Sequence, residues 1–147
     1  MKSLRLPSHN KPGMKVAVDQ LISRQPGLVP QYSGRLTASR IWAATMFVDH
    51  FTDCTFACLM RSTSQEETLQ AKAAFERKLK EFSVLVNSYH ADNGRFAEKE
   101  FREEIIKNNQ SISFCAVGAH HQNGLVENRI KDCTLEARTI LLHSKRF

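Results

Sequence analysis

The sequence predicts an α/β fold in which helices cover a mixed β-sheet. The main observation is the order of its local signals: three strand-like stretches come first, and helix and strand signals then alternate to the end of the chain. The length of 147 residues suits one domain with a buried core. A content of 41% hydrophobic and 24% charged residues is typical of globular rather than disordered chains.

The first half of the chain predicts three consecutive strands, which we expect to pair as antiparallel neighbours. Residues 14–21, MKVAVDQL, predict a short strand that ends near Asp19, and residues 25–35 predict a turn-rich connection. Residues 40–60 contain too many aromatic and β-branched side chains for a surface helix. We therefore expect two strands there, joined by a tight turn at residues 50–53.

The second half predicts helices that alternate with strands. The clearest helix covers residues 62–82, where Ser64 can cap the first turn and Glu67 can complete a capping box. Its apolar stripe consists of Ala71, Phe75, Leu79 and Phe82. The elements expected after it are a buried strand at residues 83–91, a helix at 97–109, a strand at 111–117 and a long final helix at 125–143.

The charge of the chain is basic and unevenly distributed. The formal net charge is +6 and the sequence pI is near 9.4. Residues 1–48 hold seven Lys or Arg residues against one acid, Asp19. A polyanionic partner would explain this excess, and so would an ordinary solvated basic surface. The charge alone does not separate these two interpretations.

The sequence also indicates the compartment. No apolar run is long enough to span a bilayer or to serve as a secretory signal, so we expect an intracellular, reducing environment. The four cysteines include no C-x-x-C pair, and we expect them to be buried thiols rather than a disulfide framework. The cysteines and histidines within residues 50–58 and 115–121 lack the spacing of a structural zinc site.

Three acidic residues could meet at one end of the predicted sheet. Asp92 falls where a central strand leaves the sheet, and sites in open α/β sheets favour such strand ends. Glu127 falls in the first turn of the final helix, and the 34 residues between Asp92 and Glu127 provide one helix and one strand that can return the chain to the same edge. Asp19, at the end of the first strand, could supply a third carboxylate.

Each of these acids also has a purely structural interpretation. Asp92 begins an Asp-Asn-Gly sequence, which is a strong turn signal. Glu127 and Lys131 are spaced i, i+4 and can form a surface pair on a helix. Asp49 follows an equally good strand, so strand periodicity does not choose between Asp19 and Asp49.

The ordered series of acidic segments resembles a known family. VAVDQL, TMFVDHFTD, YHADNGRF and HHQNGLVENRI are together similar to the catalytic core of integrases from copia-type long-terminal-repeat retrotransposons. That family is related to retroviral integrases and to the wider DDE transposase group. The resemblance divides the chain into a basic N-terminal segment (1–14), an integrase catalytic core (15–143) and a C-terminal tail (144–147).

The resemblance implies a ribonuclease-H-like fold, with a five-stranded mixed sheet of three antiparallel and then two parallel strands and with helices on both faces. It makes Asp19, Asp92 and Glu127 the catalytic and metal-binding carboxylates. Two Mg²⁺ ions are the implied cofactors, and Mn²⁺ can substitute. Asp49 matches an acidic position that is not a ligand in the family.

The implied function is polynucleotidyl transfer, in which the 3′ ends of retroelement DNA are trimmed and then joined to target DNA. We expect Asn123, Arg129, Lys131 and Arg138 to bind DNA. Arg129 and Arg138 can equally pair with acids on their own helix. We also expect no membrane contact, a homo-oligomer in the full-length integrase, and a location in the nucleus, as an integration complex, or in the cytoplasm.

Two other functions stay open from the sequence. Full-length integrases of the family carry a zinc-binding domain ahead of the core, so we expect either a core fragment of a polyprotein or a catalytically decayed or domesticated fragment that only binds DNA. The intact acids at all three positions argue against decay, whereas the truncation argues for it. The loop at residues 118–124 also departs from many family members at Ala119 and His120. The third interpretation is a ribonuclease-H-like nuclease that hydrolyses phosphodiesters without strand transfer.

Overall fold

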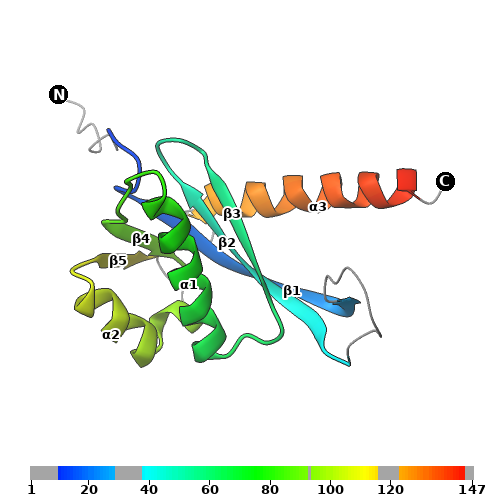
Figure 1. Cartoon of the computed structure of the whole chain (residues 1–147), viewed down its shortest axis with the longest axis horizontal. Coiled ribbons are helices and arrows are strands. Elements are labelled where there is room, and N and C mark those ends of the chain that lie inside the picture. The colour runs from blue at the N-terminus through cyan, green and yellow to red at the C-terminus, as the bar shows by residue number, and fades with distance from the viewer. Residues whose placement is uncertain (1–9, 29–37, 93, 116–122, 145–147) are drawn as a thin grey trace.

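The computed structural model describes residues 10–28, 38–92, 94–115 and 123–144, which form one sheet with helices on both faces (Figure 1). β1, β2 and β3 pair in antiparallel fashion, and β4 and β5 run parallel to β1. The mixed five-stranded sheet predicted from the sequence is confirmed, in the order β3-β2-β1-β4-β5. The strands are β1 (Val16–Leu28), β2 (Arg40–Asp49), β3 (Thr55–Met60), β4 (Ser88–Ala91) and β5 (Ser111–Phe114).

Helices cover the two faces of the sheet unequally. The described helices are α1 (Gln65–Lys80), α2 (Lys99–Lys107) and α3 (Gly124–Ser144), with a short 3-10 turn η1 (Arg95–Ala97) ahead of α2. α1 and α2 pack on one face, and α3 crosses β1 and β2 on the other. Figure 1 shows that α3 then runs on past the strands. None of the described helices has the length and apolar character that crossing a membrane requires.

β1 is the central strand of the sheet, and its first residues are buried on both faces. Val16 and Val18 belong, with Phe75 of α1, to the larger apolar core. Ala17 points the other way and belongs to a smaller core with Val126 of α3. Because side chains alternate along a strand, a strand covered on both faces has to be apolar at successive positions. The Val-Ala-Val sequence meets this requirement up to Asp19, the first polar residue of β1.

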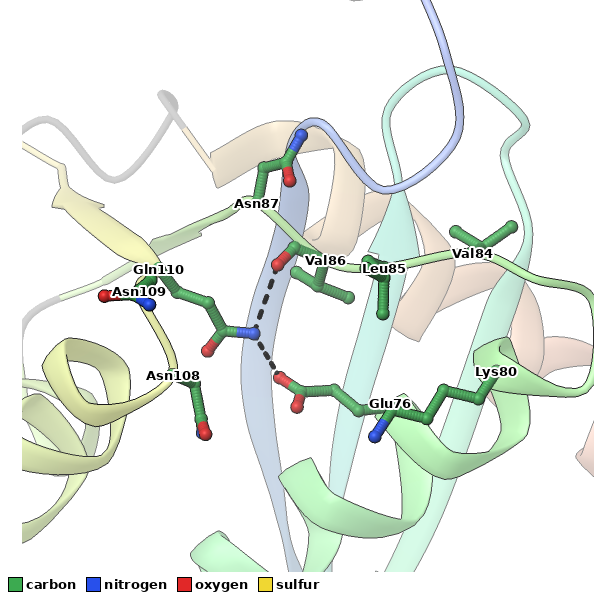
Figure 2. A pocket seen from close by; sticks show the side chains of 9 residues that line it. All are labelled: Glu76, Lys80, Val84, Leu85, Val86, Asn87, Asn108, Asn109 and Gln110. Carbon is green, nitrogen blue, oxygen red and sulfur yellow. Dashed lines mark hydrogen bonds between the residues drawn. The ribbon is translucent and has the colours of Figure 1, made fainter.

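A polar network joins α1 to the segments that precede β4 and β5. The Glu76 carboxylate accepts hydrogen bonds from Tyr89 Oη (2.6 Å) and Gln110 Nε2 (2.7 Å), and it pairs with Lys72 Nζ at 2.8 Å. Gln110 also donates to the Val86 carbonyl, beside a hollow of about 230 Å³ (Figure 2). Burial alone would raise the pKa of Glu76, but the hydrogen bonds of its three partners and the Lys72 charge outweigh it and lower this pKa.

β1 is longer than the sequence predicted. It does not end near Asp19, because residues 20–22 and 27–28 continue to pair with β2. A register shift between Ile22 and Gly27 accommodates the Pro-Gly step that had suggested a turn-rich connection at residues 25–35. Residues 29–37 of that predicted connection lie outside the described residues.

β4 is shorter than the predicted strand at residues 83–91, because the chain first turns after α1. Ser83 has a φ of 58°, which interrupts an extended conformation. The Asn87 N–H donates to the Gly13 carbonyl at 2.7 Å, and regular pairing begins only at Ser88. The helices predicted at 97–109 and 125–143, and the strand within 111–117, are confirmed as α2, α3 and β5.

The two ends of α1 differ in how well they were predicted. Ser64 caps the helix as expected, with its Oγ accepting from the Glu67 N–H at 3.3 Å. The Glu67 carboxylate does not close a capping box, because it accepts from the backbone N–H groups of Arg61 and Ser62 at 2.8 and 3.2 Å. Phe82 was wrong as a member of the apolar stripe, since it follows the helix and is 69% exposed.

The cysteines were also not uniformly buried, as the sequence had suggested. Cys115 is buried and Cys58 is half-buried, whereas Cys54 and Cys133 are exposed. All four are free thiols. The apolar residues around Cys54 and Cys133 in the sequence belong to a turn and to an uncovered part of α3, so their hydrophobicity does not translate into burial.

Asp49 holds the chain together where β1 begins. Asp49 is 3% exposed. Its carboxylate accepts hydrogen bonds from the Gly13 N–H (2.9 Å) and from both the N–H and the hydroxyl of Thr52 (2.8 Å each). Gly13 has a φ of 81°, and a Cβ there would collide with the Leu85 carbonyl. Asp49 therefore holds together the chain segments around Gly13, Thr52 and Leu85, and their close approach requires a glycine at position 13.

We predict that Asp49→Ala lowers the free energy of unfolding by about 1–3 kcal/mol, because it leaves the buried Gly13 N–H without its acceptor. Urea unfolding of the variant and the parent chain measures this difference. Asp132→Ala, at an exposed position of α3, is the control and should change stability by no more than about 0.5 kcal/mol. Equal stability of the two variants would contradict the structural role given to Asp49.

Candidate active site

Two of the predicted acids follow paired positions on neighbouring strands. β1 and β4 are parallel, with Val18 opposite Ala91. The next residue on each strand is Asp19 and Asp92, so the backbones of the two acids lie side by side where β4 ends. Asp19 Oδ1 accepts from the Gln20 N–H at 2.8 Å. This position at a strand end is the one that sequence analysis predicted for Asp92.

Asp49 stands at the other end of the paired segment. It lies opposite Val16 of β1, whereas Asp19 lies opposite Met46 of β2. At about 3.3 Å per residue, the three residues from Met46 to Asp49 span about 10 Å. Together with the bonds that Asp49 makes to Gly13 and Thr52, this separation favours Asp19 as the neighbour of Asp92.

α3 begins at the same end of the sheet and brings Glu127 to it. Asn123, 2% exposed, donates from Nδ2 to the Val18 carbonyl at 3.2 Å, and Val126 is fully buried. These contacts anchor the first turn of the helix on β1. Glu127 is exposed on that turn, where a carboxylate interacts favourably with the helix dipole. Glu127 and Asp19 line one hollow of about 380 Å³ between β1 and α3.

The field of all three carboxylates acts on a single thiol. Cys115 follows β5 directly, is 3% exposed, and donates its N–H to the Ala91 carbonyl at 3.0 Å. Burial raises the pKa of the Cys115 thiol, and the negative charges of Asp92, Glu127 and Asp19 raise it further, in that order. The structure therefore brings the three predicted site residues within electrostatic reach of one point.

The carboxylates are not gathered into a closed metal-binding cluster. Within the described ranges, no three side chains of His, Cys, Asp or Glu are close enough together to hold a metal ion. The donor set itself fits Mg²⁺, which prefers carboxylate oxygens and keeps several waters.

Sequence analysis missed a histidine that lies beside this thiol. His90 of β4 is 9% exposed, with Nδ1 at 2.7 Å from Ser113 Oγ and Nε2 at 3.5 Å from Cys115 Sγ. It connects the ends of β4 and β5 next to the acids. The available signal was its place two residues before Asp92, which puts both side chains on the same face of the strand.

The four residues predicted to bind DNA have different surroundings. Lys131 is exposed and lines the hollow between β1 and α3, and Arg138 is exposed further along α3. Arg129 pairs with Asp53 of the β2–β3 turn at 3.3 Å, and not with an acid of its own helix. Asn123 is buried and bonded to β1, so in this arrangement its side chain anchors α3 and does not face a surface partner.

Comparisons with known proteins agree on the fold. No family model matches the chain, and no curated protein matches its sequence. The catalytic core domain of the HTLV-2 integrase in complex with magnesium is similar in its trimeric form (TM-score 0.64, 16% identity, 92% of this chain and 76% of that chain). Its dimeric form gives a TM-score of 0.62 with 17% identity, over 90% of this chain and 74% of that chain.

A further similar structure is the simian T-cell lymphotropic virus intasome in complex with PP2A regulatory subunit B56 gamma, with a TM-score of 0.65 and 15% identity over 82% of this chain and 38% of that chain. Identities this low show the fold alone. The chain therefore has the ribonuclease-H-like fold of integrase catalytic cores, as the resemblance of its acidic segments implied.

We predict that Asp92→Asn lowers the pKa of the Cys115 thiol. Of the three carboxylates that disfavour the thiolate, Asp92 has the largest effect on this pKa, and the substitution removes its charge. The thiol is titrated by ultraviolet absorbance in a background in which the other three cysteines are replaced by Ser. Asp49→Asn, at the other end of β1, is the matched control and should leave the Cys115 pKa unchanged. An equal response to both substitutions would show that Asp92 is not near Cys115.

Proposed function

We propose that the chain is the catalytic core of a retroelement integrase, of the copia type that its acidic segments resemble, and that it transfers DNA strands with Mg²⁺. The observation that carries this proposal is the placement of Asp19 and Asp92 directly after the paired residues Val18 and Ala91, with Glu127 lining the same hollow as Asp19, on the fold of integrase cores. In this function the protein trims the 3′ ends of retroelement DNA and joins them to target DNA.

The metal ions would be held by the three carboxylates. Asp19 and Asp92 come from adjacent strands, which limits their relative motion, and Glu127 comes from a helix turn anchored by Val126 and Asn123. When bound, two Mg²⁺ ions would activate the attacking oxygen and stabilise the leaving one. The HTLV-2 core was solved in complex with magnesium, which supports the choice of ion.

The nucleophile would come from outside the protein. Water would attack when the DNA ends are trimmed, and the new 3′-hydroxyl would attack when they are joined. Cys115 feels the charges of the three acids, and its raised pKa keeps the thiol protonated and therefore a poor nucleophile. Phosphoryl transfer of this kind depends on positioning and electrostatics, which the acids and the ions would supply.

DNA would lie along the hollow between β1 and α3. Lys131 lines this hollow beside Glu127, and Arg138 follows two turns later on the exposed part of the helix. Such cations would contact phosphates and position the DNA without reading its sequence. We also propose a second copy of the chain as a partner and the nucleus as the place of action; the dimeric, trimeric and intasome forms of the similar integrases support the former.

We predict that Mg²⁺ raises the melting temperature of the parent chain and that Asp92→Asn loses most of this increase. The cation relieves the repulsion among the carboxylates only when it binds the folded site. Without metal, Asp92→Asn should be at least as stable as the parent chain, because it removes a repelling charge and keeps the shape. Thermal melts over a series of Mg²⁺ concentrations measure both effects.

Two comparisons make this prediction specific. Asp132→Asn, at an exposed position of α3, should keep the full response to Mg²⁺. In an assay on branched DNA with Mg²⁺ or Mn²⁺, the parent chain should cleave and rejoin strands, and Glu127→Gln should do neither. Equal stabilisation of the parent chain and Asp92→Asn by Mg²⁺ would exclude Asp92 as a ligand, and cleavage without rejoining would indicate a nuclease.

We further predict that DNA affinity falls steeply with salt and depends little on sequence, because phosphate contacts release condensed counterions. Lys131→Gln and Arg138→Gln should each flatten the log-log dependence of the binding constant on salt by about one unit. Fluorescence anisotropy of labelled duplex DNA at several salt concentrations measures the slope. Unchanged slopes in both variants would place the DNA away from α3.

A further inference from the structure

Beyond the end of β4, β1 and β2 continue side by side, with β3 paired to β2 as far as Ala43, and they form a two-stranded ribbon beyond that residue. β4 pairs with β1 only as far as Val18, whereas β1 and β2 pair as far as Leu28 and Arg40. Figure 1 shows the two strands running together past α1 and the shorter strands. The ribbon begins beyond Ile22 and Ala43, three residues past Asp19, so a DNA strand that reaches the acids along β1 from this side also passes the ribbon.

The ribbon carries the only tryptophan of the chain, Trp42. Asp19 is opposite Met46, and Leu21 is opposite Ala44, in the pairing of β1 with β2. Because side chains alternate, Trp42 shares the sheet face of these residues, which is the face that α3 crosses further along. Trp42 is 44% exposed and Leu21 is 39% exposed, so this part of the face is uncovered by the described helices.

The distance from the acids to the tryptophan is set by the strand geometry. Four residues separate Met46, opposite Asp19, from Trp42, which corresponds to about 13 Å. A strand of duplex DNA carries one phosphate per about 3.4 Å. The distance from the acids to Trp42 therefore corresponds to about four nucleotides at duplex spacing, and an extended single strand spans it with fewer.

The charge around Trp42 favours a nucleic acid over an apolar protein partner. No acidic residue occurs between Asp19 and Asp49 in the sequence. The ribbon contributes Arg24 and Arg40, and Lys131 of α3 lines the same hollow as Leu21, together with the acids Asp19 and Glu127. An exposed aromatic ring on a basic surface is the combination that binds single strands, with cations along the backbone and the ring against a base.

We propose that Trp42 is a stacking platform for an unpaired base of single-stranded DNA next to the catalytic acids. The inference rests on the proposed function for the presence of DNA, but it assigns a separate contact that needs neither metal nor chemistry. Stacking of a base that has left its duplex would favour DNA whose strands separate near the reacting phosphate. Because Trp42 belongs to β2, the strand holds its ring in place, and stacking on a base costs the side chain little conformational freedom.

The test uses the fluorescence of Trp42 itself, which no other tryptophan obscures. The 147-residue chain is titrated without Mg²⁺ with a single-stranded oligodeoxythymidylate and, separately, with the same strand annealed to its complement. We expect quenching by the single strand and little or none by the duplex. Equal quenching by both, or none by either, would overturn the proposal.

Variants separate stacking from mere exposure. Trp42→Leu should raise the Kd for a labelled single strand at least about fivefold, and Trp42→Phe should restore most of the affinity. Phe51→Leu removes another exposed aromatic ring, in the β2–β3 turn, and should leave the Kd unchanged. If Trp42→Leu binds like Phe51→Leu, Trp42 does not stack on a base. Emission that changes with protein concentration in the absence of DNA would instead assign Trp42 to a contact between copies.

The outcome is independent of the proposed catalysis. Asp92→Asn should show the same quenching as the parent chain, because the stacking contact does not involve the acids. Quenching without any Mg²⁺-dependent cleavage would leave the stacking platform standing and would overturn the enzyme function. Mg²⁺-dependent cleavage without quenching would overturn the stacking platform and leave the enzyme function standing.

Discussion

The parallel pairing of β1 with β4 is the constraint on which the rest of the structure depends. It joins Val16 to Tyr89, residues 73 positions apart (89 minus 16), and it extends only to Val18 and Ala91. A parallel pair needs a long crossover, and here β2, β3 and α1 provide it. If this short ladder were shifted by one residue, Asp19 and Asp92 would point to opposite faces of the sheet.

Packing on the α1 face stabilises that pairing. Phe47 of β2 stacks on Phe75 of α1 with ring centroids 4.4 Å apart, and it meets the edge of Tyr89 of β4 at 6.3 Å. The aromatic contacts thus connect a strand and the helix of the crossover with the strand that follows it. The opposite face has a smaller core, in which Ala17 and Val48 receive the first turn of α3. Asp19 and Glu127 lie on the face with the smaller core, beside the first turn of α3.

The sequence was sufficient for the elements whose local signals agree with their burial. α1 has a cap and an amphipathic stripe, and the strand-rich stretch at residues 40–60 has a turn in its middle, so both were predicted. The length of β1 was not, because its extension depends on pairing with β2 across a bulge, and pairing is a long-range property. For the same reason periodicity left Asp19 and Asp49 equivalent, and only their partners on neighbouring strands distinguish them.

Side-chain roles were harder to predict than backbone elements. Asn123 was expected to bind DNA, yet its amide is buried and bonded to the backbone of β1. His90 offered only its place two residues before Asp92 as a signal, and Cys115 offered none; the two meet only because β4 and β5 are adjacent. Contacts of this kind depend on the register of strands that the sequence does not specify directly.

The unequal support of α3 has a mechanical consequence. Its first turn is clamped to β1, whereas Leu135, Ile140, Leu141 and Leu142 are more than 60% exposed and pack against none of the described elements. From Leu135 to Leu142 the helix is therefore an unsupported arm of about 10 Å, at 1.5 Å per residue. Bending of its free end displaces Glu127 very little, because Glu127 lies beside the clamp. A partner that binds those apolar side chains, however, would exert a torque on the first turn of α3. The free part of the helix would then transmit an outside force to Glu127 and not to the other two acids.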